Sequence, residues 1–467
     1  MNFSDKTTKL AASILPFIGA AAFISLIFGN NLWMDEAFSA VLVKGSFSEM
    51  MEKSLADTLP PLYNILNWSF TKLLGFSAPA LRLSSLIPML GCLALGGTLV
   101  RSRFGDKCSL IYVLCMTGMP ALLYYLTEIR MYALGLFFVT ATGILALELA
   151  HKKTGDLTLC CFLIASAAGA GYTHHFAFVA AGFVYLFLLV YSIFQIKEHP
   201  ILLRRVIICI AGTLILYIPC FFSTLKQTAR VQGYFTMPEA DAGVILGCLK
   251  QPFITNCTPL SALLLLAFAA VTAYGVYALF IKKNREFIPP LACILLYPCV
   301  MLFGFLANVI LKANIFSQRY LVPSLGLFWL GFAIICSKIC LSKKLSRIAL
   351  ILLLGAVVIF DYGDRFVSEY APGADEMTSF FSENVSPGDS YIIYEDDYQI
   401  RICFRYYFPD LVCTTWDEVP EGGRLWYIEV PGFETKKEEI TAHGYTAEKA
   451  GDFSFDRYSF TLYSLTR

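Results

Sequence analysis

The chain has 467 residues, of which 57% are hydrophobic and 15% are charged, and its mean hydropathy is +0.63. An ordinary globular domain carries about 25% charged residues, so this composition excludes a disordered chain, a collagen-like fibre, a small disulfide scaffold and an ordinary soluble enzyme. The 36 Lys and Arg residues nearly balance the 35 Asp and Glu residues, and the net charge of +1 gives no indication of a nucleic-acid partner.

The sequence predicts an α-helical polytopic membrane protein with about 11 transmembrane helices. A hydrocarbon core of about 30 Å needs roughly 20 apolar helical residues per crossing. The nearly unbroken apolar run 157–196 would reach about twice that thickness, so we expect it to turn back between Gly169 and His175. The expected spans are residues 10–28, 80–100, 108–126, 132–150, 157–173, 176–196, 206–225, 257–281, 288–311, 321–341 and 346–362.

The distribution of Lys and Arg predicts how these helices are oriented. One set of helix ends, which includes those near Lys6, Arg101 and Lys152, holds more of these residues than the longer loops on the other side. Cytoplasmic loops carry the excess of Lys and Arg, so we expect a cytoplasmic N-terminus and, with an odd number of spans, an external C-terminus. No small-residue cleavage site follows the first apolar run, which we therefore interpret as an anchor.

Two long loops are expected on the outer side, at residues 29–79 and about 226–256. Part of the first loop has apolar residues at helical spacing, which predicts a helix that lies in the membrane interface. These apolar residues are Phe47, Met50, Met51 and Leu55.

The composition changes after Asp361, because residues 363–467 are polar and contain no segment long enough to cross a membrane. Apolar β-rich runs alternate there with helix-like stretches, as is typical of a small α/β domain. We therefore divide the chain into a transmembrane domain, residues 1–362, and an extracytoplasmic α/β domain, residues 363–467. The expected strands are 391–394, 411–415 and 425–430, the expected helices are 374–383, 398–408 and 434–442, and the run 453–465 alternates like one or two half-buried strands.

Most of the 15 cysteines lie in apolar spans, where Cys behaves as a small hydrophobic residue. The pairs Cys248/Cys257 and Cys403/Cys413 are on the outer side and could form disulfides, but we favour reduced thiols. The sequence has no C-x-x-C metal pattern.

Four clusters of polar residues fall in or beside the expected outer connections, where charge at the membrane edge is expensive and suggests function. The first is the adjacent pair Asp35 and Glu36. Capping of the next helix and catalysis explain this pair equally well. Because adjacent helical residues do not share a face, we expect only one of them to face a site, and we favour Asp35.

The second cluster runs from Asp57 through Pro60 and Pro61 to Tyr63. A helix cap and a rigid turn explain Asp57 and the two prolines. They do not explain the apolar and aromatic residues that follow on an outer helix, and these favour contact with lipid or with a lipid substrate. The residues are Leu62, Tyr63, Trp68 and Phe70.

The third cluster, in a very short outer connection, contains Glu128, Arg130 and Tyr132. Glu128 and Arg130 could simply pair with each other. We favour a phosphate-binding role for Arg130, because its planar guanidinium suits a phosphate and a hairpin tip needs no such ion pair.

The fourth cluster is His174 and His175. Such residues are most often hydrogen-bonded in the core, and two adjacent His residues rarely bind one metal, so the metal signal is weak. A fifth and weaker candidate is Arg319, which is also explained as an interfacial anchor. The sequence contains no nucleotide-binding glycine loop and no H-E-x-x-H motif. The outer carboxylates and arginines suit a lipid-phosphate substrate in the membrane.

Together these motifs resemble the GT-C superfamily of membrane glycosyltransferases, specifically the protein O-mannosyltransferase-like group that includes aminoarabinose lipid A transferases. The resemblance covers about residues 10–340, and it is specific in the first 135 residues and looser afterwards. One departure is Leu59, because relatives often carry His before the two prolines. The matching motifs are Asp35-Glu36, Asp57 to Tyr63, Leu81-Arg82-Leu83, Glu128 to Leu134, Thr173-His174-His175 and Gln318 to Pro323.

The resemblance implies an inverting transfer of a sugar from a polyprenyl-phosphate donor to an acceptor hydroxyl at the outer face. Asp35 would be the general base, Arg130 would neutralise the phosphate, and Glu128 would position substrate or hold Arg130. The loop 226–256, with Gly233, would close over the donor, and the C-terminal domain would recognise the acceptor. The acceptor is a protein, a lipid or a wall polymer, and the donor needs no nucleotide.

The site residues expected from the sequence fall into two groups. The candidate catalytic residues are Asp35, Glu36 and Glu128; the candidate substrate-binding residues are Asp57, Tyr63, Arg130, Tyr132, His174, His175 and Arg319. No metal ligands are assigned. No cofactor is required by this chemistry, and a divalent metal held by the outer carboxylates is a further alternative that EDTA would test.

Two other functions compete with this one. A transporter or flippase for a lipid-linked glycan usually places its charges on broken helices near the midplane, whereas the charges here gather at one face. A non-catalytic cell-envelope assembly protein would not depend on Asp35.

Overall fold

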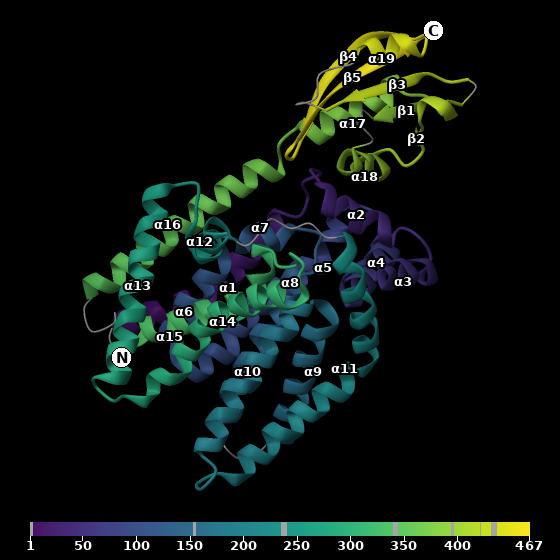
Figure 1. Cartoon of the computed structure of the whole chain (residues 1–467). Helices are drawn as coiled ribbons and strands as arrows, with labels where there is room; N and C mark the ends of the chain where they lie inside the picture. The colour runs from purple at the N-terminus through teal and green to yellow at the C-terminus, as the bar shows by residue number, and fades with distance from the viewer. Residues whose placement is uncertain are drawn as a thin grey trace.

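The computed structural model describes residues 3–152, 156–234, 241–339, 344–393, 397–420, 422–430 and 437–467. These residues form a bundle of helices and a small α/β region, and helix α16 runs from one to the other (Figure 1). The helices up to this connection are α1 (Phe3–Ser25), α2 (Met34–Val43), α3 (Phe47–Ala56), α4 (Leu62–Leu74), α5 (Ala78–Leu95), α6 (Arg101–Gly118), α7 (Leu122–Thr127), α8 (Tyr132–Lys152), α9 (Leu157–Thr173), α10 (His175–Phe194), α11 (Pro200–Tyr234), α12 (Ala242–Lys250), α13 (Thr258–Phe280), α14 (Ile288–Leu311), α15 (Leu325–Ile339) and α16 (Lys344–Glu369).

The chain is a multi-pass membrane protein. In its described part, eight helical stretches are long and apolar enough to cross a membrane, and each of the eleven expected spans falls mainly on helical residues. One stretch, Ala78–Gly118, holds two expected spans because its 41 residues bend at Gly105, whose φ is 86°. The other two expected spans are α9, which has only 17 residues, and α16.

The third expected span, 108–126, is wrong in its extent. Helix α6 ends at Gly118 and α7 begins at Leu122. Pro120 has no N–H to continue the helix, and Ala121 adopts a φ of 69° that turns the chain. In contrast, the turn expected within 157–196 is confirmed, because α9 ends at Thr173 and α10 begins at His175.

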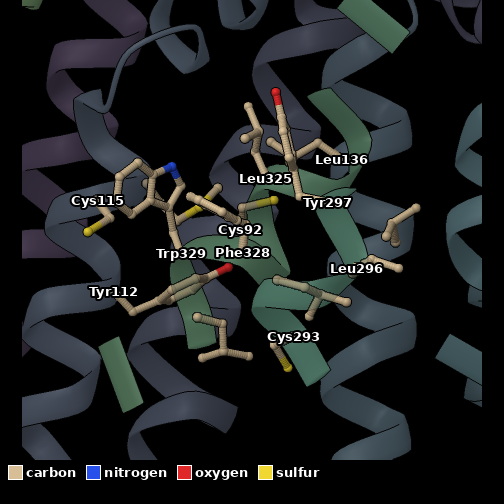
Figure 2. Packing of buried hydrophobic residues seen from close by; sticks show 14 of the residues in the cluster. Cys92, Tyr112, Cys115, Leu136, Cys293, Leu296, Tyr297, Leu325, Phe328 and Trp329 are labelled. Carbon is tan, nitrogen blue, oxygen red and sulfur yellow. The ribbon is translucent and has the colours of Figure 1, made fainter. Parts of the chain in front are cut away.

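The middle of the bundle is packed with aromatic, aliphatic and cysteine side chains (Figure 2). Trp329 and Phe328 of α15 lie between α5, α6 and α14, and Phe328 is 5.3 Å from the ring of Tyr297. Cys92, Cys115 and Cys293 fill small spaces among them. No disulfide links the described cysteines.

The outer loop expected at 226–256 is partly helical. Helix α11 continues to Tyr234, and α12 follows from Ala242 to Lys250. The centre of the loop, 235–240, lies outside the described residues. The interfacial helix expected in the first loop is α3, which leaves Phe47 and Leu55 exposed.

The α/β region contains α17 (Gly373–Asn384), α18 (Tyr398–Tyr407), α19 (Lys437–Ala442) and a five-stranded sheet with the order β2-β1-β3-β5-β4. β1 pairs in parallel with β2 and β3, and β5 pairs antiparallel with β3 and β4. The predicted strands and helices are found in this order, although Tyr394 and residues 431–436 lie outside the described residues. The strands are β1 (Ser390–Ile393), β2 (Val412–Cys413), β3 (Leu425–Glu429), β4 (Thr446–Phe455) and β5 (Tyr458–Thr466).

The α/β region is docked on the start of the connection between α1 and α2. The Leu32 N–H donates to Tyr407 Oη at 2.7 Å, and this hydroxyl donates to the Asn30 carbonyl at 2.6 Å. Asn31 Nδ2 donates to the Ala371 carbonyl at 2.6 Å. Ala37 of α2 is buried in the same apolar cluster as the core of the α/β region. Helix α2 therefore belongs to both parts of the molecule.

Candidate functional site

Asp35 lies in the first turn of α2 and is only 8% exposed. Arg319 Nη1 donates a hydrogen bond to Asp35 Oδ2 at 2.5 Å, and Arg130 Nε lies 3.8 Å from the same oxygen. Arg130 comes from the connection before α8, and Arg319 comes from the 3-10 turn Gln318–Ser324 before α15. The structure thus gathers three predicted site residues from distant parts of the chain around one carboxylate oxygen.

The connection between α7 and α8 is fixed by bonds to its backbone. The Ser85 hydroxyl of α5 donates to the Glu128 carbonyl at 2.6 Å, and the Arg130 N–H donates to the same carbonyl at 2.7 Å. Arg130 Nη1 donates to Ser39 Oγ of α2 at 3.2 Å. Among the described ion pairs, Arg130 pairs with Asp35 and not with Glu128, so the simple local pair considered from the sequence is not observed.

The Glu128 side chain is 1% exposed, and neither of its carboxylate oxygens has a hydrogen-bond partner in the described part of the chain. Three nearby groups are also buried there without an acceptor: Trp33 Nε1, Tyr132 Oη and Arg319 Nε. Buried polar atoms normally have partners, so these unsatisfied atoms mark a place that a polar ligand would satisfy.

Burial raises the pKa of Glu128 to about 8, and the neighbouring carboxylate of Glu36 adds to the shift. Burial also raises the pKa of Glu36, to about 7, although the charge of Arg82 opposes this. Two carboxyl groups with raised pKa values therefore lie close to the Asp35 cluster, which is common at functional sites.

Glu36 has different partners from Asp35. Its Oε1 atom accepts the Ile129 N–H at 3.0 Å and lies 4.0 Å from Nη2 of Arg82. Its Oε2 atom accepts the Trp33 N–H at 3.4 Å at the start of α2. Asp35 thus faces Arg130 and Arg319, whereas Glu36 faces Arg82. The expectation that only one of the two adjacent acids faces the site stays a prediction, as does the catalytic assignment of Glu36.

A small cleft opens beside Arg130. Its wall includes Asp57 and Tyr63, two further residues predicted from the sequence. Asp57 Oδ1 also accepts the Thr58 N–H at 2.7 Å, so the structural role as a turn residue is present as well. The complete lining is Phe38, Ser39, Leu42, Asp57, Leu59, Pro60, Tyr63, Asn64, Arg130 and Met131.

The two histidines have separate surroundings. His175 Nε2 donates to the Thr58 carbonyl at 3.1 Å, and Gln227 Nε2 donates to the Leu59 carbonyl at 3.1 Å, so α10 and α11 hold the loop that carries Asp57. His174 is 1% exposed, and its ring lies 5.9 Å from Tyr132 and 4.9 Å from Tyr320. The hydrogen-bonded core role considered from the sequence is observed for both.

No group of three or more His, Cys, Asp or Glu side chains is arranged to hold a metal among the residues that the structure describes. Asp35 is instead paired with Arg319 and Arg130, and Glu128 is buried without a hydrogen-bond partner in the described part of the chain.

Sequence reasoning missed three charged residues that form ion pairs with one another near the site: Arg82, Arg365 and Glu369. Arg82 was seen only as part of a motif, although an Arg at the start of an apolar span was a usable signal. Arg365 and Glu369 lie at the end of α16, where the surrounding composition is polar, so nothing in the sequence separated them from surface charges.

No protein-family model and no curated protein matches the chain. The solved structure of ArnT from Cupriavidus metallidurans in the apo state matches with a TM-score of 0.64 and 10% identity over 97% of each chain. The chain thus shares the fold of ArnT. The expected fold class is therefore confirmed.

Two further solved structures share this fold. ArnT from the same organism bound to undecaprenyl phosphate matches with a TM-score of 0.60 and 12% identity over 97% of each chain. The Archaeoglobus fulgidus oligosaccharyltransferase in the apo form matches with a TM-score of 0.51 and 12% identity, over 94% of this chain and 74% of that one. At such identities the likeness extends to the fold alone.

Proposed function

We propose that this GT-C protein is an inverting glycosyltransferase that moves a sugar from a polyprenyl-phosphate donor to an acceptor hydroxyl at the outer face of the membrane. The observation that carries the proposal is the Asp35 carboxylate held by Arg319 and Arg130 at the edge of a polar cleft. The structure of ArnT bound to undecaprenyl phosphate supports the lipid-phosphate part of the proposal.

The two guanidinium groups suit a donor phosphate, because arginine binds phosphate oxygens through paired N–H groups. When the donor phosphate draws Arg130 and Arg319 toward itself, Asp35 loses its ion-pair partners and becomes available to accept the proton of the acceptor hydroxyl. The acceptor oxygen then forms a bond to the anomeric carbon while the bond to the phosphate oxygen breaks. The polyprenyl phosphate leaves with the bonding electrons, and the arginines stabilise its charge.

The cleft beside Arg130 is the place where we position the donor sugar. Ser39, Asp57 and Asn64 supply polar groups for sugar hydroxyls, and Phe38 and Leu42 supply apolar surface. Glu128 and Tyr132 lie with unsatisfied polar atoms next to the arginines. We assign Glu128 and Tyr132 to substrate positioning, and we assign His174 and His175 to the support of this part of the site.

The proposal also covers the organisation of the chain in the membrane. The N-terminus is cytoplasmic, and residues 363–467 form an extracytoplasmic domain that recognises a protein, lipid or wall-polymer acceptor. The division proposed at residue 362 falls within α16, which continues to Glu369. No metal takes part in the steps above, and the alternative, a divalent metal, predicts a loss of turnover in EDTA.

The experiment that tests the proposal reconstitutes the purified protein in liposomes with a labelled polyprenyl-phosphate sugar. We expect release of free polyprenyl phosphate together with transfer of the label to an acceptor. Movement of intact donor across the bilayer without any release would instead establish the transporter alternative. Binding of donor with neither release nor movement would favour an assembly protein.

A further inference from the structure

Three buried charged side chains, Glu36, Arg82 and Glu369, form a network with the partly buried Arg365, and none of the four lines the cleft within the described residues. The side chains of Arg82, Glu36 and Glu369 are 0%, 3% and 2% exposed. Their two positive and two negative charges are balanced. Burying charges is costly unless each has a partner, so the network has to be explained by what it holds in place.

Arg82 is the centre of the network. Its Nη1 atom forms an ion pair with Glu369, 2.7 Å from Oε2, and donates to the Gly29 carbonyl at 2.9 Å, and its Nη2 atom lies 4.0 Å from Glu36 Oε1. Arg82 belongs to α5, and its guanidinium group therefore connects this helix to α2, to α16 and to Gly29 in the segment after α1.

The network ends on both sides of Glu128. The Thr127 hydroxyl donates to Glu369 Oε1 at 2.9 Å, and Arg365 Nη2 donates to the Thr127 hydroxyl at 2.6 Å. On the other side, the Ile129 N–H donates to Glu36 Oε1 at 3.0 Å. Thr127, which directly precedes Glu128, is thus held by charged side chains of α16. Ile129, which lies between Glu128 and Arg130, is held by a charged side chain of α2.

Helix α16 leads directly to α17, the first helix of the α/β region (Figure 1). Asn31 connects the same places, because its Nδ2 atom donates to the Ala371 carbonyl and its Oδ1 atom accepts the Ala374 N–H at 3.2 Å. The end of α16 is therefore fixed to the α/β region on one side and to Thr127 on the other.

We propose that Arg82, Arg365 and Glu369 are positioning residues that couple the docking of the α/β region to the binding of the donor phosphate. They act through Thr127 and Ile129 on the connection that carries Glu128 and Arg130. This inference rests on the proposed function for its activity readout, because Arg130 is the group assigned there to the phosphate.

The test compares Glu369→Gln with the wild-type protein in the liposome assay. The amide keeps an oxygen for the Thr127 hydroxyl but removes the charge that Arg82 and Arg365 face. We expect the donor KM to rise about tenfold, with kcat changed much less and the acceptor KM unchanged. The matched control is Glu286→Gln, which breaks the exposed Lys338–Glu286 pair and is expected to change none of these values.

Hydrogen exchange of the amides at 127–131 gives a second readout that does not need turnover. We expect faster exchange there in Glu369→Gln, and no change in the control. Thr127→Val, which removes the hydroxyl between Glu369 and Arg365, replaces Glu369→Gln if the latter fails to fold. In the double variant, the two effects should combine to less than their sum, because both residues act through one contact.

The two proposals fail in different ways. Wild-type protein that does not cleave the donor refutes the proposed function, while the exchange measurement still decides whether the network holds the connection. Unchanged exchange and unchanged donor KM in Glu369→Gln and Thr127→Val overturn the positioning role.

Discussion

The helical bundle and the α/β region differ in charge and in what they contribute to the site. Residues 363–467 hold more than half of the Asp and Glu residues but only a quarter of the Lys and Arg residues. All of the residues that line the cleft come from the bundle, as do Asp35 and the two arginines that pair with it. The α/β region contacts the bundle through Tyr407, which bonds to Asn30. The end of α16 contacts the bundle through Glu369, which pairs with Arg365 and with Arg82.

This difference teaches that acidic composition alone does not locate the chemistry. Glu36 and Glu128, two acids with raised pKa values, belong to the part of the chain that is poor in acids. Burial makes each of them unusual, whereas most acids of the α/β region are exposed to solvent. Variants of residues near the cleft should therefore lose turnover. Variants of residues in the contact between the bundle and the α/β region should instead lose stability.

The largest effect is expected for Asp35→Asn. This substitution keeps the size of the side chain but removes the carboxylate that accepts the proton, and a general base contributes about 10²–10⁴-fold to rate. We expect donor cleavage to fall by that factor in reconstituted liposomes. The matched control is Asp106→Asn, whose carboxylate pairs with Arg101 away from the cleft. Cleavage that persists in Asp35→Asn removes Asp35 as the base.

The next largest effect is expected for Arg130→Ala. A hydrogen bond to a charged group contributes about 1.5–3 kcal/mol, so the donor KM should rise by about 10- to 150-fold. The acceptor KM should change much less, because Arg130 is assigned to the donor phosphate. Steady-state kinetics with each substrate varied in turn measures both values. A rise confined to the acceptor KM is the contrary outcome.

A smaller effect is expected from pH. The pKa of Glu128 is about 8, so this carboxyl is neutral below that pH and negative above it. The negative form repels the donor phosphate, and the donor KM should therefore rise as the pH passes upward through about 8. Glu128→Gln stays neutral and should remove this rise. A wild-type KM that is independent of pH between 7 and 9 would argue against a place for Glu128 beside the phosphate.

The smallest effect is expected in the contact between the bundle and the α/β region. Tyr407→Phe removes the hydroxyl that joins the Leu32 N–H and the Asn30 carbonyl. Loss of this hydroxyl costs about 1 kcal/mol and should lower the Tm by about 2 °C, with donor cleavage nearly unchanged. Thermal unfolding followed by tryptophan fluorescence measures the shift. A large loss of cleavage without a loss of stability would mean that Tyr407 acts on the site itself.

The membrane helices and the α/β region could be predicted because their patterns are local. Long apolar runs predicted the spans. The alternating patterns after Asp361 predicted the succession of strands and helices along the chain. The break at Pro120 and Ala121 was missed, since the apolar run continues through it and hides the turn.

The candidate site could be predicted only in part, for a different reason. Asp35, Arg130 and Arg319 stood out as charges in short outer connections, and the structure brings them together. Their pairing could not be predicted, because Arg319 lies 284 residues from Asp35. Glu369 was invisible in the sequence, since its burial depends on how the end of α16 packs against Arg82.

The most direct test of the central claim measures binding of polyprenyl phosphate to Asp35→Asn beside its loss of turnover. In the proposed mechanism, Asp35 competes with the donor phosphate for Arg130 and Arg319. Removing its charge should therefore preserve or tighten the binding of polyprenyl phosphate while donor cleavage is lost. Binding that disappears together with cleavage, in a variant that remains folded, would contradict the account.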